Sequence, residues 1–188
     1  MGFSSSIRQY LSKKFLISLI VALATILLVV TLGTWLGTHV PEDEAQEYWT
    51  ILESQAEEAT WDAIFLNNLT LSLPTLIPFF GIGWILFIML NTGFFLGAVS
   101  IVIFPGDTLT RLILVLFAIF LFPGFIVAFF EFGAYTLLLG EVFCVTYLAL
   151  TRSGARERLK KHFWKTLLIY VVLLLIGAYV EEALILWQ

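Results

Sequence analysis

Two short stretches place amide, carboxyl and glycine residues together inside an otherwise apolar run. One is Asn91 to Gly97, and the other runs from Pro123-Gly124 to Glu131-Phe132-Gly133. Residues 63–151 contain only four charged residues, which are Asp107, Arg111, Glu131 and Glu141. A charged side chain at the centre of a bilayer costs about 2.5–3.5 kcal/mol or more, so such a residue is a functional candidate. A protonatable carboxyl group beside amides is the usual material of a proton or cation relay.

Glu131 is the first candidate, and the alternative is a structural glutamate that bonds backbone groups freed at a helix break. Asn91 is the expected partner of Glu131, because an amide–carboxyl hydrogen bond would tie their two helices together. Glu141 is expected to pair with Arg152 or Arg156 in a structural role. The predicted intramembrane polar site comprises Glu131, Asn91, Asn67, Asn68 and Glu181, and the glycines expected at close helix contacts are Gly93, Gly97 and Gly133.

The composition indicates an integral membrane protein that crosses the bilayer several times. Of its 188 residues, 60% are hydrophobic and 13% are charged, whereas soluble domains are nearer half apolar and a quarter charged. We find no phosphate loop, zinc-ligand spacing or dinucleotide fingerprint, so we expect no metal or other cofactor and no nucleic acid. No catalytic triad, HExxH or GxSxG motif is present, which favours a protein that is not an enzyme.

The elements that must position these residues are all helical, in one transmembrane domain over residues 1–188. Residues 15–37 form the first span, since about twenty apolar residues cross a bilayer. Residues 41–62 hold eight acidic and no basic residues, and they predict an acidic amphipathic helix outside the membrane. A short helix and then a long one are expected in residues 63–104 and again in 107–150. A basic loop over 152–165 and a last span over 166–188 follow.

Proline and glycine residues mark the expected breaks between the short and long helices. The break residues are Pro74, Pro78, Gly81, Gly83, Pro123 and Gly124. Both the N-terminal basic residues and loop 152–165 should be cytoplasmic by the positive-inside rule. An even number of crossings must therefore separate them, so at least one of the five helices between them should be re-entrant. Residues 109–122 are the first choice because they are about 21 Å long at 1.5 Å per residue, too short to span.

The order of several short motifs resembles a known family. These motifs are Asn67-Asn68-Leu69, Asn91-x-Gly93-x-x-x-Gly97, Pro123 followed by Glu131 and Ala134, and Leu175 to Glu181. Together they resemble the stage II sporulation protein M family, over most of the chain after the first span. The namesake is an assembly protein for a peptidoglycan-remodelling complex in spore-forming bacteria. The resemblance therefore implies a membrane scaffold rather than a known reaction.

Two functions remain open from the sequence. The first is a non-enzymatic assembly or recruitment scaffold in the cell envelope, with residues 41–62 outside the cytoplasm. The second is a small ion or solute transporter or channel in which Glu131, Asn91 and Glu181 line a path. The expected partners are the lipid bilayer, other envelope proteins and further copies of the chain.

Overall fold

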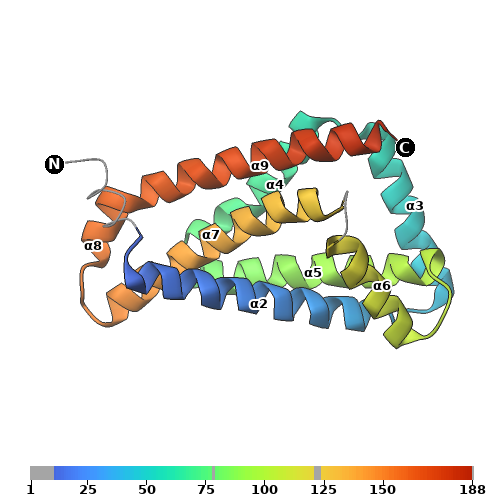
Figure 1. The fold of residues 1–188 in the computed structure, drawn as a ribbon, viewed down its shortest axis with the longest axis horizontal. Coiled ribbons are helices and arrows are strands. Elements are labelled where there is room, and N and C mark those ends of the chain that lie inside the picture. Colours follow the sequence, from blue (N-terminus) through green and yellow to red (C-terminus); the bar gives the residue numbers. More distant parts are fainter. Residues whose placement is uncertain (1–10, 78, 121–123, 188) are drawn as a thin grey trace.

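The computed structural model describes residues 11–77, 79–120 and 124–187, and it contains no strand in these ranges. The described part is a bundle of helices (Figure 1). In chain order the elements are α2 (Lys13–Gly37), α3 (Glu42–Glu58), α4 (Trp61–Ser72), a 3-10 turn η1 (Leu73–Leu76), α5 (Phe80–Ile103), α6 (Thr108–Phe120), α7 (Gly124–Leu150), α8 (Ala155–Arg158), a π-helical turn η2 (Leu159–Phe163) and α9 (Trp164–Ile185). The expected all-α architecture is confirmed.

Four of these helices are long and apolar enough to cross a membrane. They are α2, α5, α7 and α9, of which α9 continues from α8 through η2. At 22 to 27 residues they are roughly 33–40 Å long, which exceeds the roughly 30 Å hydrocarbon core. Their outer faces expose large apolar side chains, including Ile20 at 69% and Leu28 at 70%. The chain is thus a multi-pass membrane protein.

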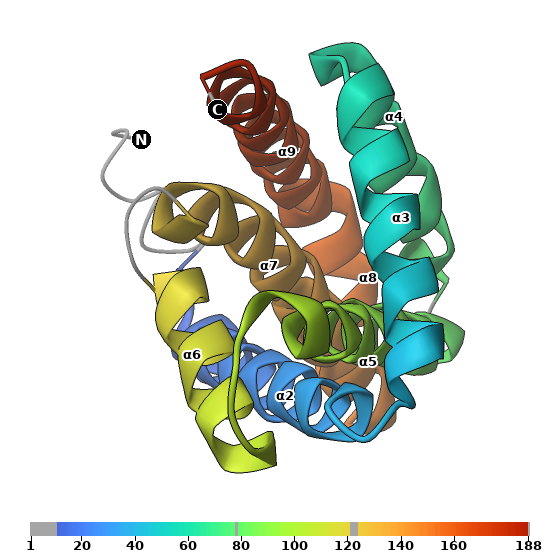
Figure 2. The same ribbon diagram turned by 90° about the vertical axis from the view of Figure 1, so that its right-hand side faces the viewer.

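Two further helices are short, as the sequence indicates. Helix α4 has 12 residues and α6 has 13, or about 18–20 Å each at 1.5 Å per residue. Viewed along the bundle, α4 lies beside α9 on one flank and α6 lies on another flank, next to α2 (Figure 2). Neither is long enough to cross a bilayer alone, and together they account for the short helices expected in residues 63–104 and 107–150.

Glycines let α2 and α5 pack backbone against backbone. A Cβ atom added to Gly93 would overlap the carbonyl oxygen of Val30, and one added to Gly97 would overlap that of Thr34. On the facing helix, Gly33 and Gly37 lie equally close to the backbone of α5. The small-xxx-small spacing on both helices permits this approach. Gly133 differs from the prediction, because a Cβ added there meets nothing within 4 Å; it faces an apolar groove beside α2 and α9.

The break before α5 lies earlier than predicted. Helix α4 ends at Ser72, and Pro74 falls at the start of η1. Gly81 and Gly83 both lie inside α5 and do not interrupt it. Gly81 instead packs against the backbone of Thr75, whereas a Cβ added at Gly83 meets nothing within 4 Å. The chain turns just before α5, where Phe79 has a φ of 65°.

The other predicted breaks fall at the edge of what the structure describes. Helix α6 ends at Phe120 and α7 begins at Gly124, so a change of helix does occur there. Pro123 and Pro78 lie outside the described residues.

The two ends of the bundle carry opposite charges. At one end Lys14 Nζ donates to Ser153 Oγ at 3.4 Å, and the Arg158 guanidinium lies 4.1 Å from the Phe15 ring centroid. Lys14 and loop 152–165 therefore share one end, as an even number of crossings requires. Acidic helix α3 crosses the other end (Figure 1). We call these the basic end and the acidic end.

Candidate functional site

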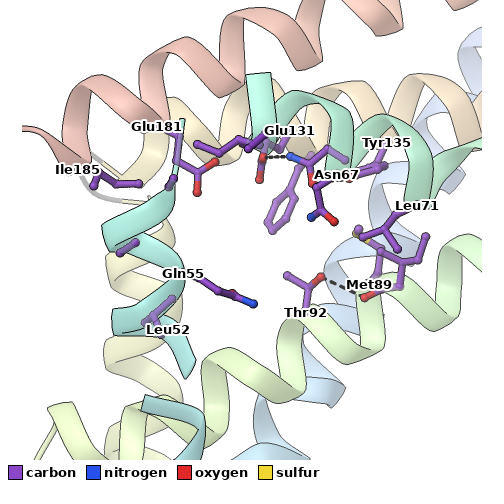
Figure 3. Close-up of a pocket in the computed structure, with 17 residues that line it drawn as sticks. Leu52, Gln55, Asn67, Leu71, Met89, Thr92, Glu131, Tyr135, Glu181 and Ile185 are labelled. Carbon is purple, nitrogen blue, oxygen red and sulfur yellow. Dashed lines mark hydrogen bonds between the residues drawn. The ribbon is translucent and has the colours of Figure 1, made fainter. Parts of the chain in front are cut away.

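A cavity of about 550 Å³ lies between α3, α4, α5, α7 and α9, near the acidic end (Figure 3). Seven of its lining side chains can hydrogen-bond, although most of the bundle interior is apolar. The polar lining consists of Gln55, Asn67, Asn68, Thr92, Glu131, Tyr135 and Glu181, and the apolar lining includes Leu52, Ile88, Met89, Phe132 and Ile185. Four of the five residues predicted to form the polar site thus meet in one cavity.

Glu131 lies two turns into α7 and is held by α4. Asn68 Nδ2 donates to Glu131 Oε1 at 2.7 Å, and the Tyr135 hydroxyl donates to Asn68 Oδ1 at 3.3 Å. Since Tyr135 is four residues after Glu131, both project from the same face of α7. The amide of Asn68 therefore bridges two groups of α7 and fixes the carboxyl group at the cavity wall.

The predicted pairing of Asn91 with Glu131 is wrong. Asn91 is exposed, and its Nδ2 donates to the carbonyl oxygen of Phe87 in its own helix at 2.8 Å. The residues of α5 that line the cavity are Ile88, Met89 and Thr92. Asn91 is absent from this lining because its side chain leaves the helix on a different face. Asn68 is the amide that takes the expected place.

Glu181 enters the cavity from α9. Its carboxyl group makes no hydrogen bond or ion pair within the described part of the chain, and it interacts electrostatically with Glu131. Asn67 of α4 and Gln55 of α3 also point into the open space without a hydrogen bond to the described residues (Figure 3). Gln55 and Asn67 are exposed and Glu181 is half-buried, so water can solvate these three side chains and a ligand in the cavity can reach them.

The cavity is closed towards the basic end by packed side chains. Tyr170 of α9 and Ser72 at the end of α4 are hydrogen-bonded through their hydroxyl groups. Met89, Leu138 and Leu174 are at most 1% exposed and belong to the core that continues below. The site is therefore a pocket with a floor and not a continuous pore, and the exposed lining residues Gln55 of α3 and Asn67 of α4 border its opening.

Aromatic contacts hold the two helices that cover the cavity. The rings of Trp61 in α4 and Tyr179 in α9 stack with centroids 4.5 Å apart. Tyr48 of α3 makes edge contacts with Phe94 and Phe95 of α5, at 5.9 and 5.8 Å. Each such pair contributes about 0.5–1.5 kcal/mol beyond its buried area, so α3 and α4 are fixed over the cavity by specific contacts.

Glu141 belongs to a separate cluster at the basic end. Arg158 Nε donates to Glu141 Oε1 at 2.8 Å, and Nη2 donates to Oε2 at 2.5 Å. Thr166 Oγ1 adds a third hydrogen bond to Oε2 at 2.8 Å. The expected partners Arg152 and Arg156 are both exposed, so that pairing is corrected to Arg158. The cluster joins α7, α8 and α9 through a buried ion pair.

Sequence reasoning missed three polar residues of the cavity. Tyr135 could have been found from its helical spacing to Glu131, and Thr92 from its place beside Asn91. Gln55 could not, because nothing in an acidic surface helix distinguishes the one amide that faces inward. In the described residues we find no group of three histidine, cysteine or carboxylate side chains that could hold a metal ion.

Comparison with known proteins places the chain in a family. The family model described as stage II sporulation protein M matches residues 15–184. No curated protein and no solved structure shows significant similarity. The match extends from the first long helix to the last and includes every residue of the cavity except Ile185. The chain belongs to the stage II sporulation protein M family.

Proposed function

We propose that this protein is a non-enzymatic membrane scaffold of the cell envelope that recruits a partner through the acidic helix α3. One observation carries the proposal: α3 is fixed to the end of the bundle with its charged face exposed. Ala45 is fully buried and Tyr48 packs on α5, which leaves the acidic side chains outward. Those exposed are Glu42, Asp43, Glu44, Glu47 and Glu53.

The charges at the basic end support a cytoplasmic assignment for that end. Arg152, Arg156, Lys160, Lys161 and Lys165 are all exposed, and short cytoplasmic loops are rich in such residues. Helix α3 would then face the outside of the cell membrane. A partner that binds there would present a basic extramembrane segment, because opposite potentials steer encounter and fix register.

Charge reversal tests the scaffold. A crosslinker placed at the exposed position Ile51 of α3 should join wild type to its partner in membranes. The Glu42→Lys, Glu47→Lys variant should lose these crosslinks. Reversal at the opposite end, by Lys160→Glu and Lys161→Glu, is the matched control and should leave them intact. Crosslinks should also weaken in high salt, since exposed charges are screened over about 8–10 Å near physiological ionic strength. Crosslinking that survives reversal on α3 would refute recruitment through this face.

The cavity favours a second candidate, a small transporter for an ion or solute. Unpartnered polar groups and carboxylates inside a membrane bundle mark substrate pathways in many transporters. The packed floor separates the cavity from the basic end, and alternating access requires such a barrier on one side of a binding site. Flux into liposomes tests this candidate, with Glu131→Gln compared against Glu182→Gln, whose carboxyl group is not part of the cavity lining. Equal flux in both variants would exclude a transport path through Glu131.

A further inference from the structure

The charged residues that line the cavity are all acidic. Glu131 and Glu181 both face it, whereas no lysine, arginine or histidine is among the described residues that line it. Elsewhere in the molecule a buried carboxylate has its cation, as Glu141 has Arg158. Two carboxyl groups that repel each other in a low-dielectric interior are stabilised by a positive charge between them. The cavity therefore selects for a cation.

The size and walls of the cavity select the kind of cation. About 550 Å³ is far more than one metal ion fills, and it falls within the roughly 300–1,000 Å³ typical of small-molecule pockets. Divalent ions need about six oxygen ligands at short distance, which two carboxyl groups on different helices do not supply. Leu52, Ile88 and Met89 form an apolar side that would accept carbon atoms.

The remaining polar groups suit an ammonium group with an organic body. The amide oxygens of Gln55 and Asn67, which lie at the exposed rim of the cavity, can accept N–H donors, as can the Glu181 carboxylate. Phe132 and Tyr135 provide aromatic rings beside Glu131, and a cation over such a ring gains about 0.5–2 kcal/mol. We propose that the cavity binds a small organic ammonium ion, with Glu131 and Glu181 as its counter-ions.

The approach to the cavity is consistent with this ligand. The pocket opens beside α3, whose exposed acidic residues raise the local concentration of cations. Leu52 and Gln55 of the same helix belong to the cavity lining. An ammonium ion drawn to the acidic end would thus meet the mouth of the cavity without crossing the apolar core.

This inference deepens the transport candidate by naming the ligand, but it is tested by binding and not by flux. The probe is butylammonium chloride, titrated calorimetrically into the full-length protein in phosphatidylglycerol nanodiscs. Butan-1-ol, sodium butanoate and magnesium chloride are the neutral, anionic and metal-ion comparisons. We expect binding of butylammonium only, because the alcohol lacks the charge and the anion is repelled.

Glu181→Gln is the decisive variant, since its carboxyl group has no hydrogen-bond or ion-pair partner to lose among the residues that the structure describes. It should weaken butylammonium binding about tenfold or more, because one ammonium–carboxylate interaction disappears. The adjacent Glu182→Gln variant, outside the lining, should bind as wild type does. Glu131→Gln should also weaken binding, and a melting curve will show whether that variant remains folded.

The outcomes separate this inference from transport and from a lipid ligand. If phosphatidylethanolamine in the nanodisc competes with butylammonium, the natural source of the ammonium group is a lipid headgroup; without competition it is a free amine. Both results support the cation site. Equal binding of butan-1-ol, or full affinity in folded Glu181→Gln, would overturn it. If the protein moves cations across liposomes but does not bind butylammonium, the transport proposal is supported and the proposed ligand class is refuted.

Discussion

Arg158→Met should be the most destabilising of the conservative changes at the basic end. The side chains of Arg158 and Glu141 are only 5% and 1% exposed. Breaking a buried ion pair from one side costs about 3–5 kcal/mol, because the remaining charge is left without compensation. Glu141 would lose two of its three hydrogen bonds and keep only the one from Thr166. The variant also loses the guanidinium over Phe15, so we expect the upper part of this range.

The assay is reversible unfolding in mixed dodecyl maltoside and sodium dodecyl sulfate micelles, monitored by tryptophan fluorescence. A double variant, Glu141→Met with Arg158→Met, should regain much of the loss, since apolar replacement of a whole buried pair is often neutral. Lys161→Met is the matched control: it breaks the exposed pair with Glu157 and should change nothing measurable. The reasoning fails if Arg158→Met unfolds like Lys161→Met, or if the double variant is less stable than Arg158→Met alone.

Three further substitutions test other parts of the structure. Gly93→Val should destabilise the bundle strongly, by about 2 kcal/mol or more from overpacking against α2, whereas Gly83→Val should have little effect in the same unfolding assay. Asn68→Leu should cost about 1.5–3 kcal/mol, because a buried carboxyl group loses its hydrogen bond, and Asn91→Leu should be close to neutral. Backbone N–H donation from Thr110 lowers the pKa of Asp107. That stabilisation of α6 is present above the ordinary aspartate pKa and is lost as the pH falls through the lowered pKa. The protection factors of the α6 amides, which correct for the pH dependence of intrinsic exchange, should therefore fall at low pH in wild type but not in Asp107→Asn.

The long helices were predictable because the bilayer fixes their length and composition. The close contact between α2 and α5 was only partly accessible from sequence. Glycines four residues apart on each helix predict that it packs closely against a neighbour, but Gly93 and Gly97 were expected to approach the helix of Glu131 and instead pack on α2. Gly133 shows the limit of that argument. The same residue type on α7 borders a groove, and sequence alone does not say which side of an apolar helix meets a neighbour.

The partner of Glu131 was not predictable for the same reason. Helix α5 is apolar on all sides, so its pattern does not reveal the face on which Asn91 lies. Asn68 differs from Asn67 only by one position in α4, yet it alone bonds to Glu131. That choice depends on how α4 leans on α9 through Trp61 and Tyr179, which is a tertiary contact.

Local backbone geometry explains the other correction. Glu141 pairs with Arg158 because the chain reverses at Gly154, whose φ of 103° is left-handed, and then enters α8. This turn brings Arg158 back over Phe15 and leaves Arg152 and Arg156 at the surface. Six positive charges in one loop offer too many partners for sequence spacing to select one.

The two proposed functions meet on helix α3. Its outer face carries the exposed carboxylates, and its inner face contributes Leu52, Gln55 and Ala56 to the cavity. Only Ala59 and Thr60 separate α3 from α4, which supplies the Asn68 that holds Glu131. A partner that pulled α3 away from Phe94 and Phe95 would therefore also move the wall and the mouth of the cavity. Partner recruitment and ligand binding should therefore be coupled. Filling the cavity should change the affinity for the partner, and binding of the partner should change the affinity for the ligand by the same factor.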